Sequence, residues 1–458
     1  MPSAVQPPRR PSVDTLFSVN PDGSHNVIHT ADVHGRFQVR KRVIWTLLVV
    51  LYLALPWVLI GGHPAVLIDI ERRAFYCFGQ TFNAQDFPLA FFFLTGIGFT
   101  LIVASALFGR AWCGYACPQT VFLEGLYRRV ERWIEGGATQ RQRLQKAPWT
   151  AGKLLRRGLK LTVFAGISFW LAHSFLAYFM PIRELHAALL RPPAEHPFAF
   201  GFVLFFSAVC FGNFGFFREQ LCLIICPYGR LQGVLADKDT IVVGYDKARG
   251  EPRGKGAAHG ACVDCFRCVT VCPTGIDIRN GTQFECIGCA NCIDACDEVM
   301  DRLGRPRGLV RYDSMRGFED GKRRFLRPRL AVYALLFAVG VGVFATMALQ
   351  RTAFEANLMR PSGSPYLLEN GMLRNQLLLH LVNKTPQQQR FVLQEQGPAG
   401  AEFVIATREV LLESLSDQRV PVFVTLPRSS YVVGTKIEIL VRGAGAEHRA
   451  RIEFLGPR

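Results

Sequence analysis

The sequence predicts a bundle of membrane helices that carries an inserted cysteine-rich domain and ends in a C-terminal β-sandwich. Half of the 458 residues are hydrophobic and only 19% are charged, which is too apolar for an ordinary soluble enzyme. Eight of the 14 cysteines lie in two runs between positions 262 and 296. After position 371, short alternating or β-branched stretches are separated by turn residues, as in a sandwich of strands.

Five segments are apolar and long enough to span a bilayer, which takes about 20 residues. They are Val43–Ile60, Phe87–Phe108, Leu161–Met180, Pro197–Phe217 and Leu330–Leu349. The sequence thus predicts a membrane α-helical bundle of five transmembrane helices. Lys and Arg gather before the first segment, between the second and third, and before the fifth. The positive-inside rule therefore places the N-terminus and the 109–160 and 218–329 regions in the cytoplasm, and the C-terminus outside.

The net charge of +17 is explained by the same rule. A strongly basic chain can indicate a nucleic-acid partner. Here the basic residues flank the apolar segments, so we expect no nucleic-acid binding. The first 35 residues are polar and Pro-rich, show no cleavable signal peptide, and are expected to form a flexible cytoplasmic tail.

The two cysteine runs have the spacing of a bacterial ferredoxin. Each run is C-x2-C-x2-C-x3-C, and its members are Cys262, Cys265, Cys268 and Cys272, then Cys286, Cys289, Cys292 and Cys296. In this spacing three cysteines in a tight loop hold one [4Fe-4S] cluster, and the fourth reaches the other cluster. One cluster is therefore expected on Cys262, Cys265, Cys268 and Cys296, and the second on Cys286, Cys289, Cys292 and Cys272.

Two other interpretations of these runs are weaker. A zinc ribbon uses two C-x2-C pairs and would leave half of these cysteines without a role. A disulfide framework needs an oxidising compartment, whereas the charge pattern places this region in the reducing cytoplasm. A cytoplasmic domain of the 2[4Fe-4S] ferredoxin type remains the prediction.

Four further cysteines form two C-x3-C-P pairs, each of which follows a pair of predicted spans. They are Cys113 and Cys117, and Cys222 and Cys226. The repeat of span, span, C-x3-C-P and helix (Pro118–Glu135 and Pro227–Asp237) indicates a parallel internal duplication that brings the four thiols together near the cytoplasmic face. Proline favours the first helical position, so Cys117 and Cys226 are expected at helix N-caps, where the dipole lowers a thiol pKa.

The pattern leaves the chemistry of these four thiols open. They could bind a soft metal such as Cu(I), hold a further cluster, cycle as a dithiol, or be buried small residues. Arg110 and Arg218 beside them are expected to be snorkelling anchors or to keep thiolates ionised. His173 is read as a hydrogen-bonded core residue rather than a haem ligand. Met180 and His186 could be copper ligands on the outer side of the membrane.

The predicted domains follow from these assignments. They are a tail over 1–35, a four-helix transmembrane region over 36–240, a cytoplasmic ferredoxin domain over 241–325, a fifth transmembrane helix over 326–350, a linker over 351–371, and a periplasmic immunoglobulin-like domain over 372–458. The strands expected in the last domain begin with Asn375 and include Phe391–Gln394, Glu402–Ala406, Val420–Leu426, Lys436–Val441 and Arg449–Phe454.

Several stretches in this order resemble one known family. They include Gly35-Arg36-Phe37, Leu55-Pro56-Trp57, both C-x3-C-P sites, Cys226-Pro227-Tyr228, the double ferredoxin run, and Arg307-Gly308-Leu309-Val310-Arg311-Tyr312. The chain is similar to the CcoG (FixG/RdxA-type) cytochrome c oxidase accessory proteins from about residue 32 to its end. The resemblance implies an inner-membrane protein of Gram-negative bacteria with two [4Fe-4S] clusters.

The resemblance also implies a function. Members of the family are taken to reduce Cu(II) to Cu(I) for assembly of the cbb-type oxidase, with Cys113, Cys117, Cys222 and Cys226 handling copper. The expected partners are copper ions, a cytoplasmic electron donor, oxidase subunits or copper chaperones outside, and a second copy in a homodimer. Two rivals stay open: a quinol-linked electron relay of the nitrate or nitrous-oxide respiration type, and a non-enzymatic copper-binding scaffold.

Overall fold

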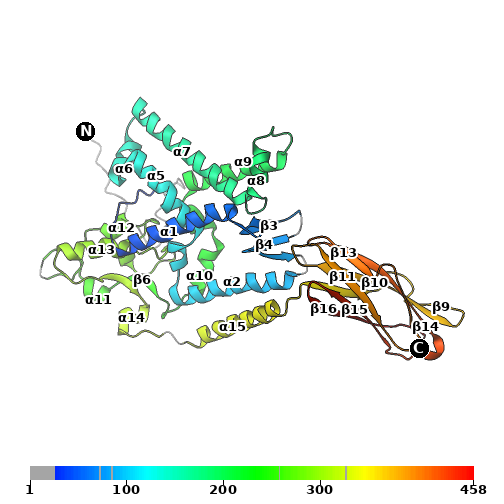
Figure 1. Cartoon of the computed structure of the whole chain (residues 1–458). Helices are drawn as coiled ribbons and strands as arrows, with labels where there is room; N and C mark the ends of the chain where they lie inside the picture. The colour runs from blue at the N-terminus through cyan, green and yellow to red at the C-terminus, as the bar shows by residue number, and fades with distance from the viewer. Residues whose placement is uncertain (1–25, 72–73, 84–85, 257, 325–326, 458) are drawn as a thin grey trace. The chain divides into compact units, whose positions relative to one another are not determined.

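The computed structural model describes residues 26–71, 74–83, 86–256, 258–324 and 327–457. The chain divides into two compact units (Figure 1). The first comprises Met1–Ala65 and Leu94–Val341, and the second Val66–Phe93 and Gly342–Arg458. Residues 1–25 of the predicted tail lie outside the described residues.

Four helices of the described residues are long and apolar enough to cross a membrane. They are α2 (Phe87–Phe108), α7 (Ala151–Leu176), α9 (Pro197–Gly212) with its π-helical extension η4 (Asn213–Phe217), and α15 (Pro328–Leu349). The bounds of α2 match the predicted span. Helix α7 begins ten residues before the predicted Leu161 because Thr150 caps its N-terminus by accepting a hydrogen bond from the Lys153 backbone.

The first predicted span differs from the structure. Helix α1 runs over Arg36–Ala54, η1 covers Leu55–Trp57, and Leu59–Ile60 is strand β1, which pairs with β2 (His63–Pro64). The first turns of α1 carry charge, and Lys41 is fully buried against Asn291 and Trp45. This helix is not among the four apolar ones. A fifth crossing therefore stays a prediction.

The start of α1 belongs to the packing of the cysteine-rich domain. The Asp294 carboxylate accepts hydrogen bonds from the backbone N–H groups of Phe37 (3.2 Å) and Gln38 (2.8 Å) at the N-terminus of α1. Residues 26–35 are also ordered against this domain, since Val33 packs on Val271 and Ala295. The prediction of a flexible tail up to residue 35 is therefore wrong for 26–35.

The cysteine-rich domain is built on a two-stranded sheet and one longer helix. Strand β6 (Val242–Tyr245) pairs antiparallel with β7 (Val310–Asp313), and α13 (Asn291–Arg302) packs beside them. The other elements of the first unit are short: α3 (Ala111–Tyr115), α4 (Pro118–Phe122), η3 (Leu123–Tyr127), α5 (Arg128–Glu135), α6 (Ala138–Lys146), α8 (Ile182–Leu189), η5 (Leu221–Ile225), α10 (Pro227–Leu235), α11 (Lys247–Gly250), α12 (Arg267–Thr270), η6 (Ile278–Asn280) and α14 (Met315–Asp320).

The second unit contains a β-sandwich of two antiparallel sheets around one apolar core (Figure 1). One sheet has the order β12-β14-β10-β8, with β9 paired to β10, and the other has the order β13-β11-β15-β16. The strands are β8 (Phe354–Met359), β9 (Leu367–Glu369), β10 (Met372–Asn383), β11 (Gln389–Gln396), β12 (Glu402–Ile405), β13 (Glu409–Leu412), β14 (Asp417–Pro427), β15 (Lys436–Gly443) and β16 (Ala446–Glu453).

One expectation fails in this unit. The segment 351–371, predicted as a linker, contains β8 and β9, because Phe354 and Ala356 fill the sandwich core. Between the first two predicted spans lies a small antiparallel sheet of β3 (Val66–Asp69), β4 (Ala74–Cys77) and β5 (Gln80–Asn83).

Candidate iron-sulfur and membrane-face cysteine sites

Each cysteine run closes around a cavity by the same backbone device. In the first run Asp264 and Phe266 have φ of 52° and 57°. Gly288 and Ala290, at the same offsets in the second run, have φ of 67° and 60°. These left-handed residues turn the chain sharply, so that successive cysteines face one point instead of alternating along a strand.

The eight cysteines line two cavities in two groups of four. Cys262, Cys265, Cys268 and Cys296 line one of them, with Cys296 supplied by α13. Cys272, Cys286, Cys289 and Cys292 line the other, which Cys268 also borders. The structure thus brings together the same two sets of four that the spacing assigns to two clusters.

The donor chemistry of both cavities fits an iron-sulfur cluster. All eight thiols are free of disulfides. Within the described ranges, no group of three or more His, Cys, Asp or Glu side chains is arranged so that it could hold a metal ion. Burial raises the pKa of Cys286 and Cys296 to about 12, so these thiols ionise readily only when a metal displaces the proton.

A buried arginine beside the first cavity was not singled out from the sequence. Arg279 lines this cavity, lies over the Phe266 ring at 4.1 Å, and is paired with Asp277 (2.7 Å) and Asp264 (2.6 Å). Its guanidinium places a fixed positive charge next to thiolates that carry negative charge when they hold iron. The run Asp277-Ile278-Arg279 shortly after Cys272-Pro273 is the signal that could have pointed to it.

The four membrane-face cysteines, Cys113, Cys117, Cys222 and Cys226, gather as the internal repeat predicts. Each of Cys113, Cys117 and Cys222 lies close enough to other members of this group for their charges to interact. Cys117 and Cys226 occupy the N-cap positions of α4 and α10, each followed by proline at N1. The Cys113 thiol lies 3.3 Å from the Gln232 Oε1 acceptor on α10, which links the two copies of the repeat.

The expected lowering of the thiol pKa at these caps is wrong for Cys117. Burial raises its pKa, although the backbone N–H groups of Gln119 and Thr120 act in the opposite direction. Burial, followed by the charges of Cys117 and Cys113, raises the pKa of Cys222 to about 12. Desolvation therefore outweighs the effect of the helix terminus on the pKa of Cys117.

The membrane-face cysteines pack directly on the loop of the second run. Cys113 forms one apolar cluster with Ile287 and Cys289. A Cβ atom added to Gly114 would lie 2.8 Å from the Cys289 Cα atom. Cys222 shares a small cavity with Pro273 and Ile287, which neighbour cysteines of the second group. The membrane-face cysteines and the loop of the second run are thus packed directly against each other.

The two arginines beside the pairs have different roles. Arg110 donates a hydrogen bond to the Phe284 carbonyl and acts electrostatically on Cys113, Cys222 and Cys286, as expected for a group that favours nearby thiolates. Arg218 is buried and forms a 2.7 Å ion pair with Glu131. The prediction that Arg218 snorkels towards the membrane surface is therefore wrong.

The structure also pairs two histidines that the sequence did not connect. The rings of His173 on α7 and His186 on α8 stack with centroids 4.9 Å apart. His173 is only 3% exposed, and neither ring nitrogen has a hydrogen-bond partner. It is therefore not the hydrogen-bonded core histidine that was expected.

Comparison with known proteins agrees with this architecture. Residues 89–136 match a 4Fe-4S binding domain, residues 217–315 a 4Fe-4S dicluster domain, and residues 344–457 the IG-like fold at the C-terminal of FixG, putative oxidoreductase. Protein RdxA of Cereibacter sphaeroides is 40% identical over 81% of this chain and 83% of its own length. The chain belongs to the FixG/RdxA family. It is therefore an iron-sulfur electron-transfer protein, and its four apolar helices make it a membrane protein.

Other members of the FixG/RdxA family and more distant proteins are also similar. Nitrogen fixation protein FixG of Rhizobium meliloti is 35% identical over 87% of this chain and 86% of its own. Putative electron transport protein YccM of Escherichia coli is 24% identical over 43% of this chain and 51% of its own. The crystal structure of a FixG-related protein from Vibrio parahaemolyticus aligns with a TM-score of 0.21 and 16% identity, over 23% of this chain and 97% of that chain.

Proposed function

We propose that this protein reduces Cu(II) to Cu(I) at the membrane-face cysteines and so supports assembly of a cbb-type cytochrome oxidase. The observation that carries the proposal is the direct packing of Cys113 and Gly114 on the loop of Cys289. It places a soft-metal donor set next to residues that suit a one-electron centre. Close packing of this kind keeps the path for an electron between the two groups short.

The protein's own residues would perform three tasks in this reaction. The eight run cysteines would hold two [4Fe-4S] clusters, which supply one electron each when bound. Cys113, Cys117, Cys222 and Cys226 would receive Cu(II), and thiolate ligands favour the Cu(I) product. Arg110 would stabilise the thiolates by its positive charge. Each Cu(II) takes up one electron and no proton.

We further propose the orientation expected from the charge pattern. The N-terminus and the ferredoxin domain would lie in the cytoplasm, and the sandwich would lie in the periplasm, facing oxidase subunits or copper chaperones. The distribution of Lys and Arg supports this arrangement in the inner membrane. Cytoplasmic thiols would stay reduced and available to metals.

The decisive experiment is anaerobic stopped-flow absorbance. Protein whose clusters have been reduced with dithionite and desalted is mixed with Cu(II) and a Cu(I)-specific chelator. We expect the cluster absorbance to return as the Cu(I) complex forms, with one Cu(I) for each electron lost. If the clusters stay reduced and no Cu(I) appears, copper reduction is excluded, and a relay without copper or a copper-binding scaffold takes its place.

A cysteine substitution tests whether the membrane-face site is on the path. Cys226→Ser is expected to slow Cu(I) formation about tenfold or more, because a hydroxyl is a poor ligand for Cu(I). Cys77→Ser is the matched control, since Cys77 is likewise a half-buried free thiol but lies on β4. Equal rates for Cys226→Ser and Cys77→Ser would remove the membrane-face cysteines from the mechanism.

A further inference from the structure

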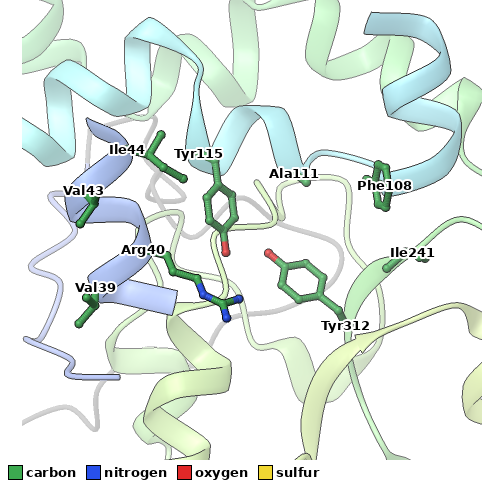
Figure 2. Close-up of a pocket in the computed structure, with 9 residues that line it drawn as sticks. All are labelled: Val39, Arg40, Val43, Ile44, Phe108, Ala111, Tyr115, Ile241 and Tyr312. Carbon is green, nitrogen blue, oxygen red and sulfur yellow. The ribbon is translucent and has the colours of Figure 1, made fainter. Parts of the chain in front are cut away.

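A cavity of about 660 Å³ lies between α1, the end of α2, the first C-x3-C pair and the ferredoxin domain. Its volume falls within the range of about 300–1,000 Å³ that is usual for small-molecule sites. The side chains of Val39, Val43, Ile44, Phe108 and Ile241 make most of its wall apolar (Figure 2). It is the kind of pocket that takes a lipophilic ring rather than a sugar or a nucleotide.

One side of this cavity is polar. In Figure 2 the hydroxyl groups of Tyr115 and Tyr312 point toward each other, and the Arg40 guanidinium lies beside them. The Tyr312 phenol and the Arg40 guanidinium are both close enough to Tyr115 to act on its hydroxyl. A guanidinium only donates hydrogen bonds, whereas a phenol both donates and accepts. Together they match a ring that carries oxygen atoms able to be either carbonyls or hydroxyls.

The polar end is joined to the second cysteine run. The Tyr312 hydroxyl donates a hydrogen bond to the carbonyl of Gly288, which lies between Cys286 and Cys289. Tyr115 lies between Cys113 and Cys117 on the other side. A ring held by these two phenols is therefore next to the loop that would carry the second cluster.

The apolar wall is open to the surroundings at the end of a membrane helix. Phe108 is the last residue of α2, and it is 48% exposed. Val39 and Val43 on α1 are 59% and 63% exposed. A membrane-dissolved molecule can thus enter from the apolar side, while Arg40, which is also exposed, lies at the polar end.

We infer that this cavity binds the head group of a membrane hydroquinone, whose oxidation supplies the electrons for copper reduction. The inference deepens the proposed function and rests on it. A quinol loses two electrons and two protons to become a quinone, and the two clusters accept one electron each. The protons pass to water at the Arg40 end. With Cu(II) as the final acceptor, one quinol and two Cu(II) give one quinone, two Cu(I) and two protons.

The test uses the full-length protein with reconstituted clusters in detergent, and decylubiquinol as the probe. In anaerobic stopped flow, decylubiquinol is expected to bleach the oxidised clusters of the wild-type protein. Val43→Trp fills the cavity and is expected to slow this bleaching at least about tenfold. Val50→Trp makes the same change at an exposed position of α1 that does not line the cavity, and it should behave as wild type.

A binding measurement without turnover accompanies the kinetics. Decylubiquinone retained by the protein after gel filtration is extracted and quantified by chromatography. Wild type and Val50→Trp should retain it, and Val43→Trp should not. Dithionite must still bleach Val43→Trp fully, which shows that its clusters and fold are intact. If the two Trp variants bleach and retain decylubiquinone equally, the assignment is overturned. It is also overturned if the wild-type protein retains phospholipid and no decylubiquinone.

The outcomes separate this inference from the proposed function. If decylubiquinol reduces no clusters but the dithionite-reduced protein still produces Cu(I), the cavity is not the donor site and copper reduction stands. If decylubiquinol reduces the clusters through this cavity and no Cu(I) forms, the cavity assignment stands and copper reduction fails.

Discussion

Gly114 occupies a position where any side chain would strike the backbone of the second cysteine run. A Cβ atom there would meet the Cys289 Cα atom at 2.8 Å and the Cys289 nitrogen at 2.9 Å. Neither atom belongs to a side chain that could rotate away. The absence of a side chain at Gly114 is thus what allows the membrane-face cysteines to touch the loop of Cys289.

Gly114→Ala is therefore expected to separate the two centres. The strain should destabilise the protein by about 1–3 kcal/mol and slow Cu(I) formation, while iron content stays at the wild-type level. Iron analysis, thermal unfolding and the stopped-flow assay measure the three quantities. Gly158→Ala is the control, because a Cβ atom at Gly158 on α7 meets nothing within 4 Å. A Gly114→Ala protein with unchanged rate would show that the contact is dispensable.

At the scale of elements, buried ion pairs join the two copies of the repeat. Glu131 on α5 binds Arg218, which follows η4, and Arg128 on α5 binds Glu219 at 2.9 Å. Arg141 and Lys160 also contact Glu131. Burial alone would raise the pKa of Glu131, but Arg218, Lys160 and Arg141 outweigh it and hold the pKa well below its ordinary range.

The lowered pKa of Glu131 gives a pH-dependent prediction. A depressed carboxyl pKa stabilises the folded state above the unfolded pKa of about 4.3, and this stabilisation is lost as the pH falls below that value. Glu131→Gln should therefore lower Tm by a constant amount between about pH 5 and 8, with a smaller difference near pH 3. Glu195→Gln, in a pair exposed to solvent, should leave Tm unchanged. A Tm difference for Glu131→Gln that grows on acidification would contradict this account.

The elements differ in how far the sequence predicts them. Both bounds of helix α2 could be predicted, because the helix is uniformly apolar between Asp86 and Gly109. Helix α1 could not, since its charged first turns look like a flanking loop until Asp294 caps them. Strand β8 was taken for a linker because its place in the sandwich depends on pairing with β10, a contact that no local pattern encodes.

At the scale of the whole molecule, the site was predictable only where spacing carries the information. The two groups of run cysteines follow from local spacing, and the gathering of the membrane-face cysteines follows from the repeat. The cavity beside them does not, because Arg40, Tyr115 and Tyr312 come from three distant parts of the chain. The contact at Gly114 is equally long-range.

Removal of iron should affect the two units differently. The first unit contains all eight run cysteines, whereas the sandwich core consists of apolar side chains without cysteine. Treatment with a chelator and oxidant is expected to lower the thermal transition of the first unit and leave that of the sandwich unchanged. Differential scanning calorimetry of the treated and untreated protein measures both. An equal shift of both transitions would show that the units unfold as one.

The ion pairs that join the two copies of the repeat also have a consequence while the ribosome makes the chain. Arg128 is synthesised 91 residues before Glu219, and Glu131 is synthesised 87 residues before Arg218. Until the second copy arrives, the nascent first half lacks those partners for charges that will be buried. The buried charges of the first copy therefore reach their full set of partners only after the second copy has been made. Dividing the chain between the two copies would remove the Glu219 partner of Arg128 and the Arg218 partner of Glu131.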